Sequence, residues 1–179
     1  PNGLNPGAFI GEVEHGEVLQ PKEVWDINNQ GQIVGRGDFS GAGDRPFRYT
    51  PPTGAETTGT TIFFSAPDML NGTGTGINDD GDVCGRYLSS EVPPILTYGN
   101  SEVTNWHAFV WTPEDELTDI GFLGFDTSTN AINDRNGNGD VQLVGSVVPL
   151  ELTESYRASR AWRYETATDG VAILDPPEL

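Results

Sequence analysis

The fold is decided by the stretch Ile77-Asn78-Asp79-Asp80-Gly81-Asp82-Val83-Cys84-Gly85. It reads as the end of one strand, a tight polar turn and the start of the next strand, because Asn, Asp and Gly tolerate the positive φ of a hairpin turn. Related segments occupy residues 26–35 and 131–145. The Ile-Asn pairs begin at positions 27, 77 and 132, so the repeat is about fifty residues long, which is typical of propeller blades.

An aromatic strand follows each of these turn segments. Its alternating pattern places two aromatic side chains on one face of the strand, and the pairs are Phe47 and Tyr49, Phe109 and Trp111, and Trp162 and Tyr164. Residues 7–10, Gly-Ala-Phe-Ile, resemble the same strand with no turn segment before it. We therefore expect one repeat domain over residues 1–179, with a half unit at 1–24 and full units at about 25–75, 76–130 and 131–179.

These patterns predict an all-β fold of repeated antiparallel hairpins or four-stranded units, arranged like propeller blades. A closed ring usually takes about four to eight blades, so the units counted here are few for one. Closure would need the half unit to complete a small ring, additional repeats, or self-association of chains. A β-sandwich or a β-solenoid of the same hairpins is the alternative.

The middle unit resembles the HAF repeat, a family named for its His-Ala-Phe triplet. The resemblance rests on the turn segment 77–85, on His107-Ala108-Phe109-Val110-Trp111, and on Leu117-Thr118-Asp119-Ile120-Gly121-Phe122-Leu123-Gly124. It extends over most of the chain, although the outer two units keep the aromatic pattern and lack the histidine. The resemblance implies an extracellular bacterial repeat protein, and it brings no established catalytic residues.

The charge of the chain excludes several partners. The net charge is −18 and Lys22 is the only lysine, so the surface should repel both nucleic acid and anionic membranes. No apolar run approaches the roughly 20 residues that span a bilayer, and Cys84 has no second cysteine with which to pair. We expect a secreted or cell-surface protein whose signal peptide lies outside this sequence.

An insertion in the third unit carries alternating oxygen side chains, in the order Asp134-Arg135-Asn136-Gly137-Asn138-Gly139-Asp140. This order matches the start of a calcium loop, in which Asp134, Asn136 and Asn138 supply side-chain oxygens and Asp140 supplies its carbonyl. The twelfth position is Gly145, so the usual bidentate Glu is missing. The sequence predicts a weak, structural Ca²⁺ site, with an enlarged Asn-Gly hairpin loop as the alternative.

The tryptophans divide into core and ligand candidates. Trp111 and Trp162 occupy repeat positions, so we expect both to pack inside the fold. Trp106 falls outside the repeat pattern, which makes it the best candidate for contact with a carbohydrate or protein ligand.

His107 and Cys84 are the residues whose chemistry most invites a catalytic interpretation. No Gly-x-Ser-x-Gly elbow accompanies His107, so we expect it to pack at a strand edge and to hydrogen-bond the backbone. Cys84 aligns with Val34 and Val144, and we expect all three in equivalent buried positions.

Two classes of function follow. The lack of a catalytic constellation favours a non-catalytic extracellular repeat module with a structural or binding role. The alternative is a hydrolase or lyase that acts on polysaccharide, with Asp79, Glu114 or Asp119 gathered around a central funnel as acid and base.

Overall fold

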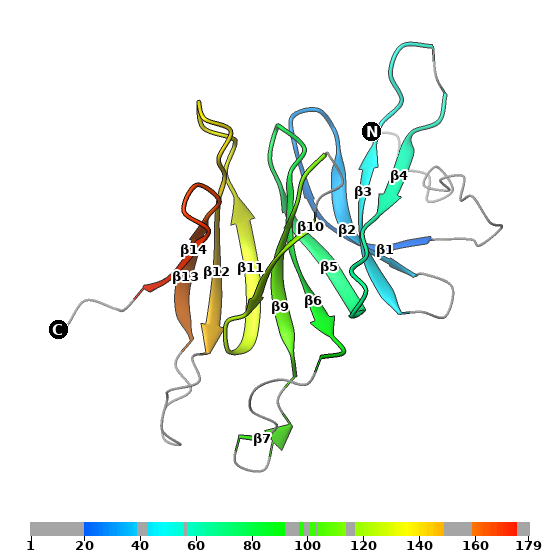
Figure 1. The fold of residues 1–179 in the computed structure, drawn as a ribbon. Coiled ribbons are helices and arrows are strands. Elements are labelled where there is room, and N and C mark those ends of the chain that lie inside the picture. The colour runs from blue at the N-terminus through cyan, green and yellow to red at the C-terminus, as the bar shows by residue number, and fades with distance from the viewer. Residues whose placement is uncertain are drawn as a thin grey trace.

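A computed structural model describes residues 20–38, 43–55, 57–91, 97–98, 101–102, 104–113, 117–148 and 159–174. These residues form no helix, and nearly all of their strands belong to three antiparallel four-stranded sheets (Figure 1). None of them forms a helix long and apolar enough to cross a membrane. The expected all-β fold of repeated four-stranded units is confirmed.

The three sheets follow one another along the chain. The first has the order β1 (Gln20–Ile27), β2 (Ile33–Asp38), β3 (Asp44–Thr50), β4 (Thr60–Phe63). The second runs from β5 (Met69–Ile77) through β6 (Val83–Ser89) and β9 (Trp106–Trp111) to β10 (Leu117–Phe122). The third has the order β11 (Phe125–Ile132), β12 (Gln142–Val148), β13 (Arg160–Glu165), β14 (Gly170–Leu174). A small ribbon pairs β7 (Thr97–Tyr98) with β8 (Ser101–Glu102).

The sheets pack face to face in chain order, and two apolar cores fill the joints between them (Figure 1). Val34 of the first sheet packs with residues of the second, including Val83, Phe109 and Trp111. The opposite face of the second sheet, with Cys84, packs on the third sheet. The described sheets form a row that does not close into a ring, so closure into a propeller stays a prediction.

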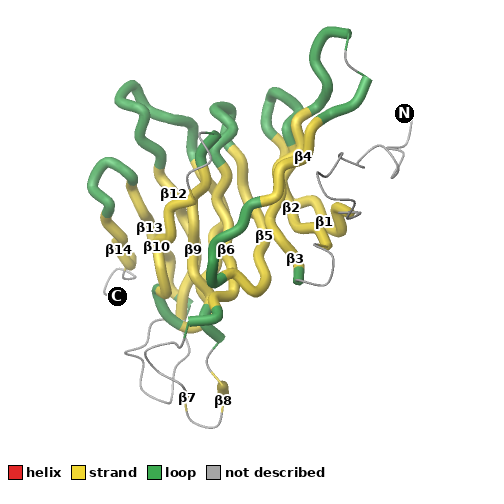
Figure 2. Tube along the Cα trace, turned by 45° about the vertical axis from the view of Figure 1, so that its right-hand side comes forward, coloured by secondary structure: helices red, strands yellow, loops and turns green. Residues whose placement is uncertain are grey.

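The three Ile-Asn turns lie at the same end of the row (Figures 1 and 2). In each turn the Oδ1 of the asparagine accepts a hydrogen bond from a backbone N–H at the start of the next strand or one residue before it. The donors to Asn28, Asn78 and Asn133 are Gln32 (2.9 Å), Asp82 (2.8 Å) and Gln142 (2.6 Å). The predicted hairpins are therefore confirmed, and the asparagine side chain organises each one.

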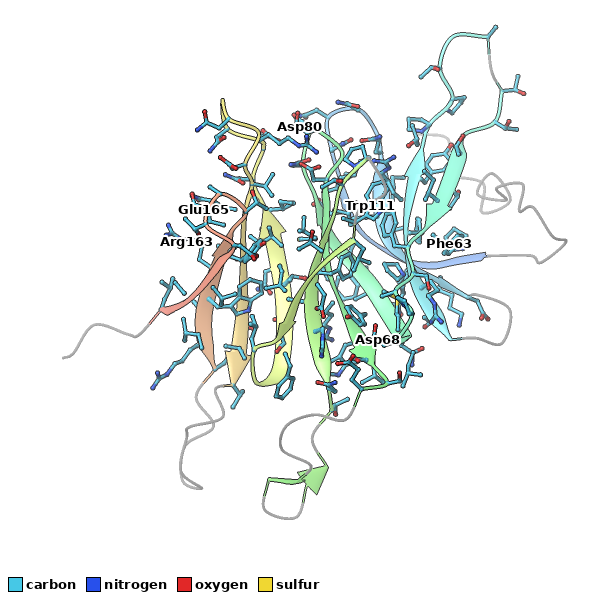
Figure 3. The ribbon with its side chains drawn as sticks, viewed as in Figure 1. Phe63, Asp68, Asp80, Trp111, Arg163 and Glu165 are labelled. Carbon is cyan, nitrogen blue, oxygen red and sulfur yellow. The ribbon has the colours of Figure 1, made fainter. Side chains whose placement is uncertain are left out.

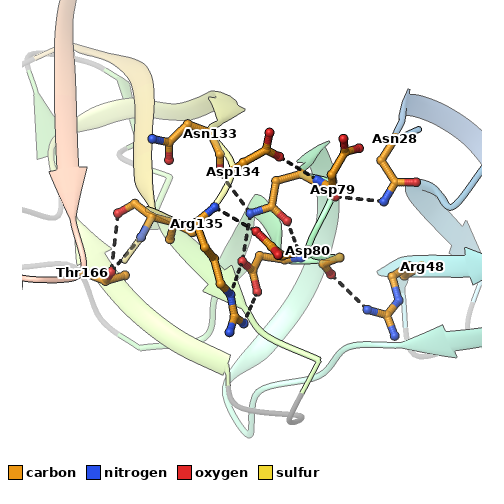
Figure 4. A network of polar contacts seen from close by, with 12 residues as sticks. Asn28, Arg48, Asp79, Asp80, Asn133, Asp134, Arg135 and Thr166 are labelled. Atoms are coloured by element: carbon orange, nitrogen blue, oxygen red, sulfur yellow. Dashed lines mark hydrogen bonds and ion pairs between the residues drawn. The ribbon is translucent and has the colours of Figure 1, made fainter. Parts of the chain in front are cut away.

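A ladder of hydrogen bonds joins each turn to the next (Figure 4). The Nδ2 of Asn28 donates to the carbonyl of Asn78, and the Nδ2 of Asn78 donates to the carbonyl of Asn133, both at 2.9 Å. One residue further on, the N–H of Asn29 donates to Asp79 and the N–H of Asp79 donates to Asp134. The same residues that form the hairpins thus also align the sheets.

An ion pair between a buried carboxylate and a half-buried guanidinium adds to the second step of this ladder. Asp82 is fully buried, and it accepts two hydrogen bonds from the Arg135 guanidinium, at 2.8 and 2.6 Å. The Nδ2 of Asn78 donates to the same carboxylate at 2.8 Å. Each charge is therefore compensated inside the protein, which a buried carboxylate requires.

Close packing of the first two strands explains why each turn segment ends in a glycine. A Cβ on Gly35, Gly85 or Gly145 would lie 1.9–2.2 Å from a carbonyl oxygen of the first strand of its sheet. A side chain there would separate the first two strands, so the repeat keeps glycine after the valine or cysteine.

Two sequence expectations need correction or adjustment. Val34 and Cys84 are fully buried as expected, but Val144 in the equivalent register is 44% exposed, because no described sheet covers the outer face of the third one.

The first strand of each sheet is the strand that leads into the Ile-Asn pair. It belongs to that sheet because it pairs with the strand after the turn. Most of the expected half unit at 1–24 lies outside the described residues.

Candidate functional site

The first strand of every sheet contains the same β-bulge. The register shifts between Val24 and Asp26 in β1, between Gly74 and Gly76 in β5, and between Thr129 and Ala131 in β11. Each shift leaves one extra residue, and these residues are Trp25, Thr75 and Asn130. Bulges re-aim side chains and are common beside binding sites. We call Trp25, Thr75 and Asn130 the bulge row.

The bulge row lines a groove along β1, β5 and β11. The groove has two lobes of about 320 and 360 Å³, and both lobes are bordered by Trp25, Thr73 and Arg86. Because β5 lies beside both β1 and β11, one repeated irregularity brings three different side chains to one surface. Trp25 is 57% exposed, and its ring is therefore open to a ligand.

The first lobe combines aromatic and charged groups. The Arg86 guanidinium carbon lies 4.6 Å from the centre of the Trp106 ring, in a cation–π arrangement. Arg36 bonds Glu23 at 2.6 Å and pairs with Asp44 at 3.5 Å. The hydrogen bond to Glu23 and the charges of both carboxylates raise the pKa of Arg36, although partial burial opposes this.

The second lobe is lined by small hydroxyl and amide side chains, Thr73, Thr75, Ser128, Thr129 and Asn130. Thr75 and Thr129 share a hydroxyl hydrogen bond of 2.7 Å across two sheets, and Ser128 shares one of 2.7 Å with Ser146. These bonds fix the hydroxyl groups in place, so this lobe presents an ordered polar surface.

Trp106, the predicted ligand candidate, borders the first lobe. The sequence did not predict Trp25 as a ligand contact, although its side chain is more exposed than that of Trp106. A signal was present, because Trp25, Thr75 and Asn130 each stand two residues before an Ile-Asn pair. The repeat alignment identified the position, but it did not reveal that a bulge turns the side chain toward the groove.

His107 lies in a separate polar cluster on the second sheet. Its Nδ1 is 2.9 Å from Oδ2 of Asp119 and 3.4 Å from the Tyr87 hydroxyl, and its Nε2 is 3.2 Å from Oδ1 of Asn105. The expected bond to backbone is therefore not the one formed, because neighbouring side chains take both ring nitrogens. The imidazole thus links three neighbouring strands, because Tyr87, His107 and Asp119 lie on β6, β9 and β10.

The charges in this cluster reinforce one another. Burial opposes protonation of His107, but the hydrogen bond and charge of Asp119 outweigh it, so the pKa of His107 is raised. Burial likewise disfavours the Asp119 carboxylate, and the hydrogen bond and charge of His107 reverse this, so the pKa of Asp119 is lowered. Each partner therefore favours the charged form of the other.

The described residues do not bring together the carboxylates that a polysaccharide hydrolase or lyase would use as acid and base. Asp79 accepts hydrogen bonds from Asn29 in the turn ladder, which lower its pKa. Asp119 belongs to the His107 cluster. Glu114, the third candidate, lies outside the described residues.

The insertion with the predicted calcium ligands contains a second turn of the same type. The Oδ1 of Asn136 accepts from the N–H groups of Asn138 and Asp140, and the Asp140 carbonyl accepts from the Asn136 N–H. Oδ1 of Asp134 accepts from the N–H of Asp79. Several of the proposed ligand oxygens thus already accept hydrogen bonds within the turn or the ladder, and a cation would have to compete with these bonds.

Among the described residues, no three acidic, histidine or cysteine side chains gather as a metal cluster. Calcium binding stays a prediction.

In comparisons with known proteins, no family model, curated protein or solved structure matches this chain. Membership of the HAF-repeat family therefore stays a prediction, and the function has to be argued from the groove itself.

Proposed function

We propose that this chain is a non-catalytic repeat module that binds a carbohydrate in the groove along β1, β5 and β11. The observation that carries the proposal is the bulge row. It places an exposed tryptophan ring next to an ordered set of hydroxyl and amide groups.

A sugar combines an apolar face with hydroxyl groups, and these two features match the aromatic ring and the polar side chains of the groove. The C–H face of a pyranose stacks on an aromatic ring, while its hydroxyls exchange hydrogen bonds with fixed polar groups. Trp25 supplies the ring, and Thr73, Ser128 and Asn130 supply polar groups on the neighbouring strands. The open groove suits a segment of a chain more than a small enclosed molecule.

An extracellular location and HAF-repeat membership belong to the same proposal. The acidic surface and the resemblance of the middle unit support both. The alternative, a polysaccharide hydrolase or lyase, has no comparable support, because Asp79 and Asp119 serve different structural clusters.

The test is binding to a panel of neutral and acidic polysaccharides, measured by affinity electrophoresis and then by calorimetry on the best binder. We expect binding without release of reducing ends, and loss of binding in Trp25→Ala. Leu70→Ala is the control, because Leu70 is a similarly exposed apolar residue outside the groove. Binding to no polysaccharide, or equal binding by both variants, would contradict the proposal.

We also propose a weak, structural Ca²⁺ site in the insertion, with Asp134, Asn136, Asn138 and the Asp140 carbonyl as ligands. Calorimetric titration with Ca²⁺ after EDTA treatment tests it, with Asp134→Ala as the comparison. We expect heat of binding in the wild type and its loss in the variant. Identical heats would leave the loop as a double Asn-Gly turn.

A further inference from the structure

Equivalent positions in the three sheets carry different charges beside the groove. Each position is a cross-strand pair between the first and second strand of its sheet. In the order of the sheets, these pairs are Glu23 with Arg36, Thr73 with Arg86, and Ser128 with Ser146. The charged side chains that line the groove therefore belong to the first two sheets, and the third sheet adds uncharged hydroxyl and amide groups.

Two carboxylates hold the guanidinium of Arg36. Its Nη2 donates to Oε1 of Glu23 at 2.6 Å, and its Nη1 lies 3.5 Å from Oδ2 of Asp44. Both carboxylates line the groove beside it. An acidic ligand that approached Arg36 would have to displace one of these carboxylates or lie next to both, and the like charges would repel each other.

The second arginine of the groove, Arg86, contacts an aromatic ring and a backbone carbonyl. Its guanidinium carbon lies 4.6 Å from the centre of the Trp106 ring, and its Nη1 donates to the Thr127 carbonyl at 3.4 Å. Arg86 borders both lobes. The charged side chains that line the groove are thus two arginines and two carboxylates, so their charges balance.

The rest of the chain surrounds this balanced groove with negative charge. The net charge of the chain is −18. The distance over which such a charge acts is about 30 Å at 0.01 M salt and about 10 Å at 0.1 M. A polyanion is therefore repelled by the chain at low ionic strength, and the groove has no excess positive charge that would offset this repulsion.

We propose that the groove binds neutral polysaccharides in preference to those that carry carboxylate or sulfate groups. This preference rests on the proposed function, because it names the class of carbohydrate that the same groove takes. A neutral pyranose needs an aromatic face and fixed hydroxyl or amide partners, and Trp25 and the side chains of the second lobe supply these. Glu23 determines the specificity, since it pairs with Arg36 and thereby cancels the charge that would attract an acidic sugar.

Polymers that share a backbone and differ in charge test this preference. The pairs are hydroxyethyl cellulose with carboxymethyl cellulose, dextran with dextran sulfate, and methyl-esterified pectin with de-esterified pectin. By calorimetry at about 0.01 M salt, where screening is weak, we expect the neutral member of each pair that binds to bind at least about fivefold more tightly. Raising the salt to about 0.15 M should narrow the difference, because the repulsion is then screened.

Glu23→Gln separates the charge of the groove from the charge of the whole chain. The variant releases Arg36 from one of its two carboxylates. We therefore expect the ratio of acidic to neutral affinity to rise about two- to fivefold, which is the effect of an exposed ion pair. Glu165→Gln is the matched control, because Glu165 lies at the end of β13 in the third sheet, outside the groove (Figure 3). It removes the same charge and should leave the ratio as in the wild type.

Three results would overturn this preference. An acidic polymer that binds as tightly as its neutral partner, or more tightly, would do so and would leave the proposed function in place. A ratio that rises no more in Glu23→Gln than in Glu165→Gln would show that the charges of the groove do not set the specificity. Binding to none of the polymers would overturn the proposed function, and the preference with it.

Discussion

His107 and Asp119 couple the stability of the second sheet to pH. The raised pKa of His107 means that its contribution to stability is complete below the unfolded value of about 6.5 and is lost as pH rises through the folded value. The lowered pKa of Asp119 means that its contribution is complete above about 4 and is lost as pH falls through the folded value. The pair should therefore stabilise the fold most between about pH 4 and 6.5.

Melting temperatures of the wild type and His107→Gln over that range and up to about pH 9 test this coupling. We expect the difference between the proteins to be greatest near pH 5–6 and to shrink as the pH rises. His15, the other histidine, is present in both proteins, so its titration cancels. A difference that does not change with pH would show that His107 acts by packing alone.

Cys84 is an inert residue of the joint between the second and third sheets. Burial raises the pKa of its thiol to about 12, so the reactive thiolate is scarce at neutral pH. We expect labelling by a disulfide reagent to be slow in the native protein and fast after denaturation. Cys84→Val should change the free energy of unfolding by less than about 1.5 kcal/mol, because Val34 fills the equivalent position. Rapid labelling of the native thiol would contradict this.

Within each sheet, the bulged first strand lies close to the glycine of the second strand, and its position depends on that glycine. A Cβ on Gly85 would lie 2.2 Å from the Thr73 carbonyl oxygen and 2.4 Å from the Phe109 ring. The strands would have to separate, which would also displace the bulge row from the groove.

We predict that Gly85→Ala lowers the free energy of unfolding by roughly 2–4 kcal/mol. Gly137→Ala is the matched control, because a Cβ there meets no atom within 4 Å. It should change stability by no more than about 0.5 kcal/mol. The measurement is urea unfolding, and equal midpoints for the two variants would show that the first two strands do not need this close approach.

The sequence predicted the hairpins well, because their determinants are local. Asn78 and Gly81 occupy fixed positions in a turn, and that chemistry is visible within five residues. The bulge at Trp25 was not predictable in the same way, since a register shift depends on the pairing of two strands. The exposure of Val144 was missed because burial depends on which sheet follows, and the repeat alignment assumes that one always does.

The whole molecule is a row of three sheets, and no described sheet covers the outer face of the third one. Repeat proteins distribute stability between units and their joints, and terminal units usually carry a polar outer face. Here the outer face of the third sheet exposes Val144, whose counterparts Val34 and Cys84 are buried in the internal joints. The groove crosses all three sheets, so any change in how the sheets align also changes the spacing of Trp25, Thr75 and Asn130.

We expect the asparagine ladder to hold the sheets together as one body. Asn78 and Asn133 make the same hydrogen bond within their turns, but only Asn78 donates across to another sheet within the described residues. The most direct test is therefore urea unfolding of Asn78→Ala and Asn133→Ala in dilute solution. We expect Asn78→Ala to lower the free energy of unfolding by roughly 2–4 kcal/mol, because it leaves the buried Asp82 carboxylate and the Asn133 carbonyl each short of a donor. For Asn133→Ala we expect a loss of about 1 kcal/mol. Equal losses for the two variants would show that the hydrogen bond between the sheets does not stabilise the fold.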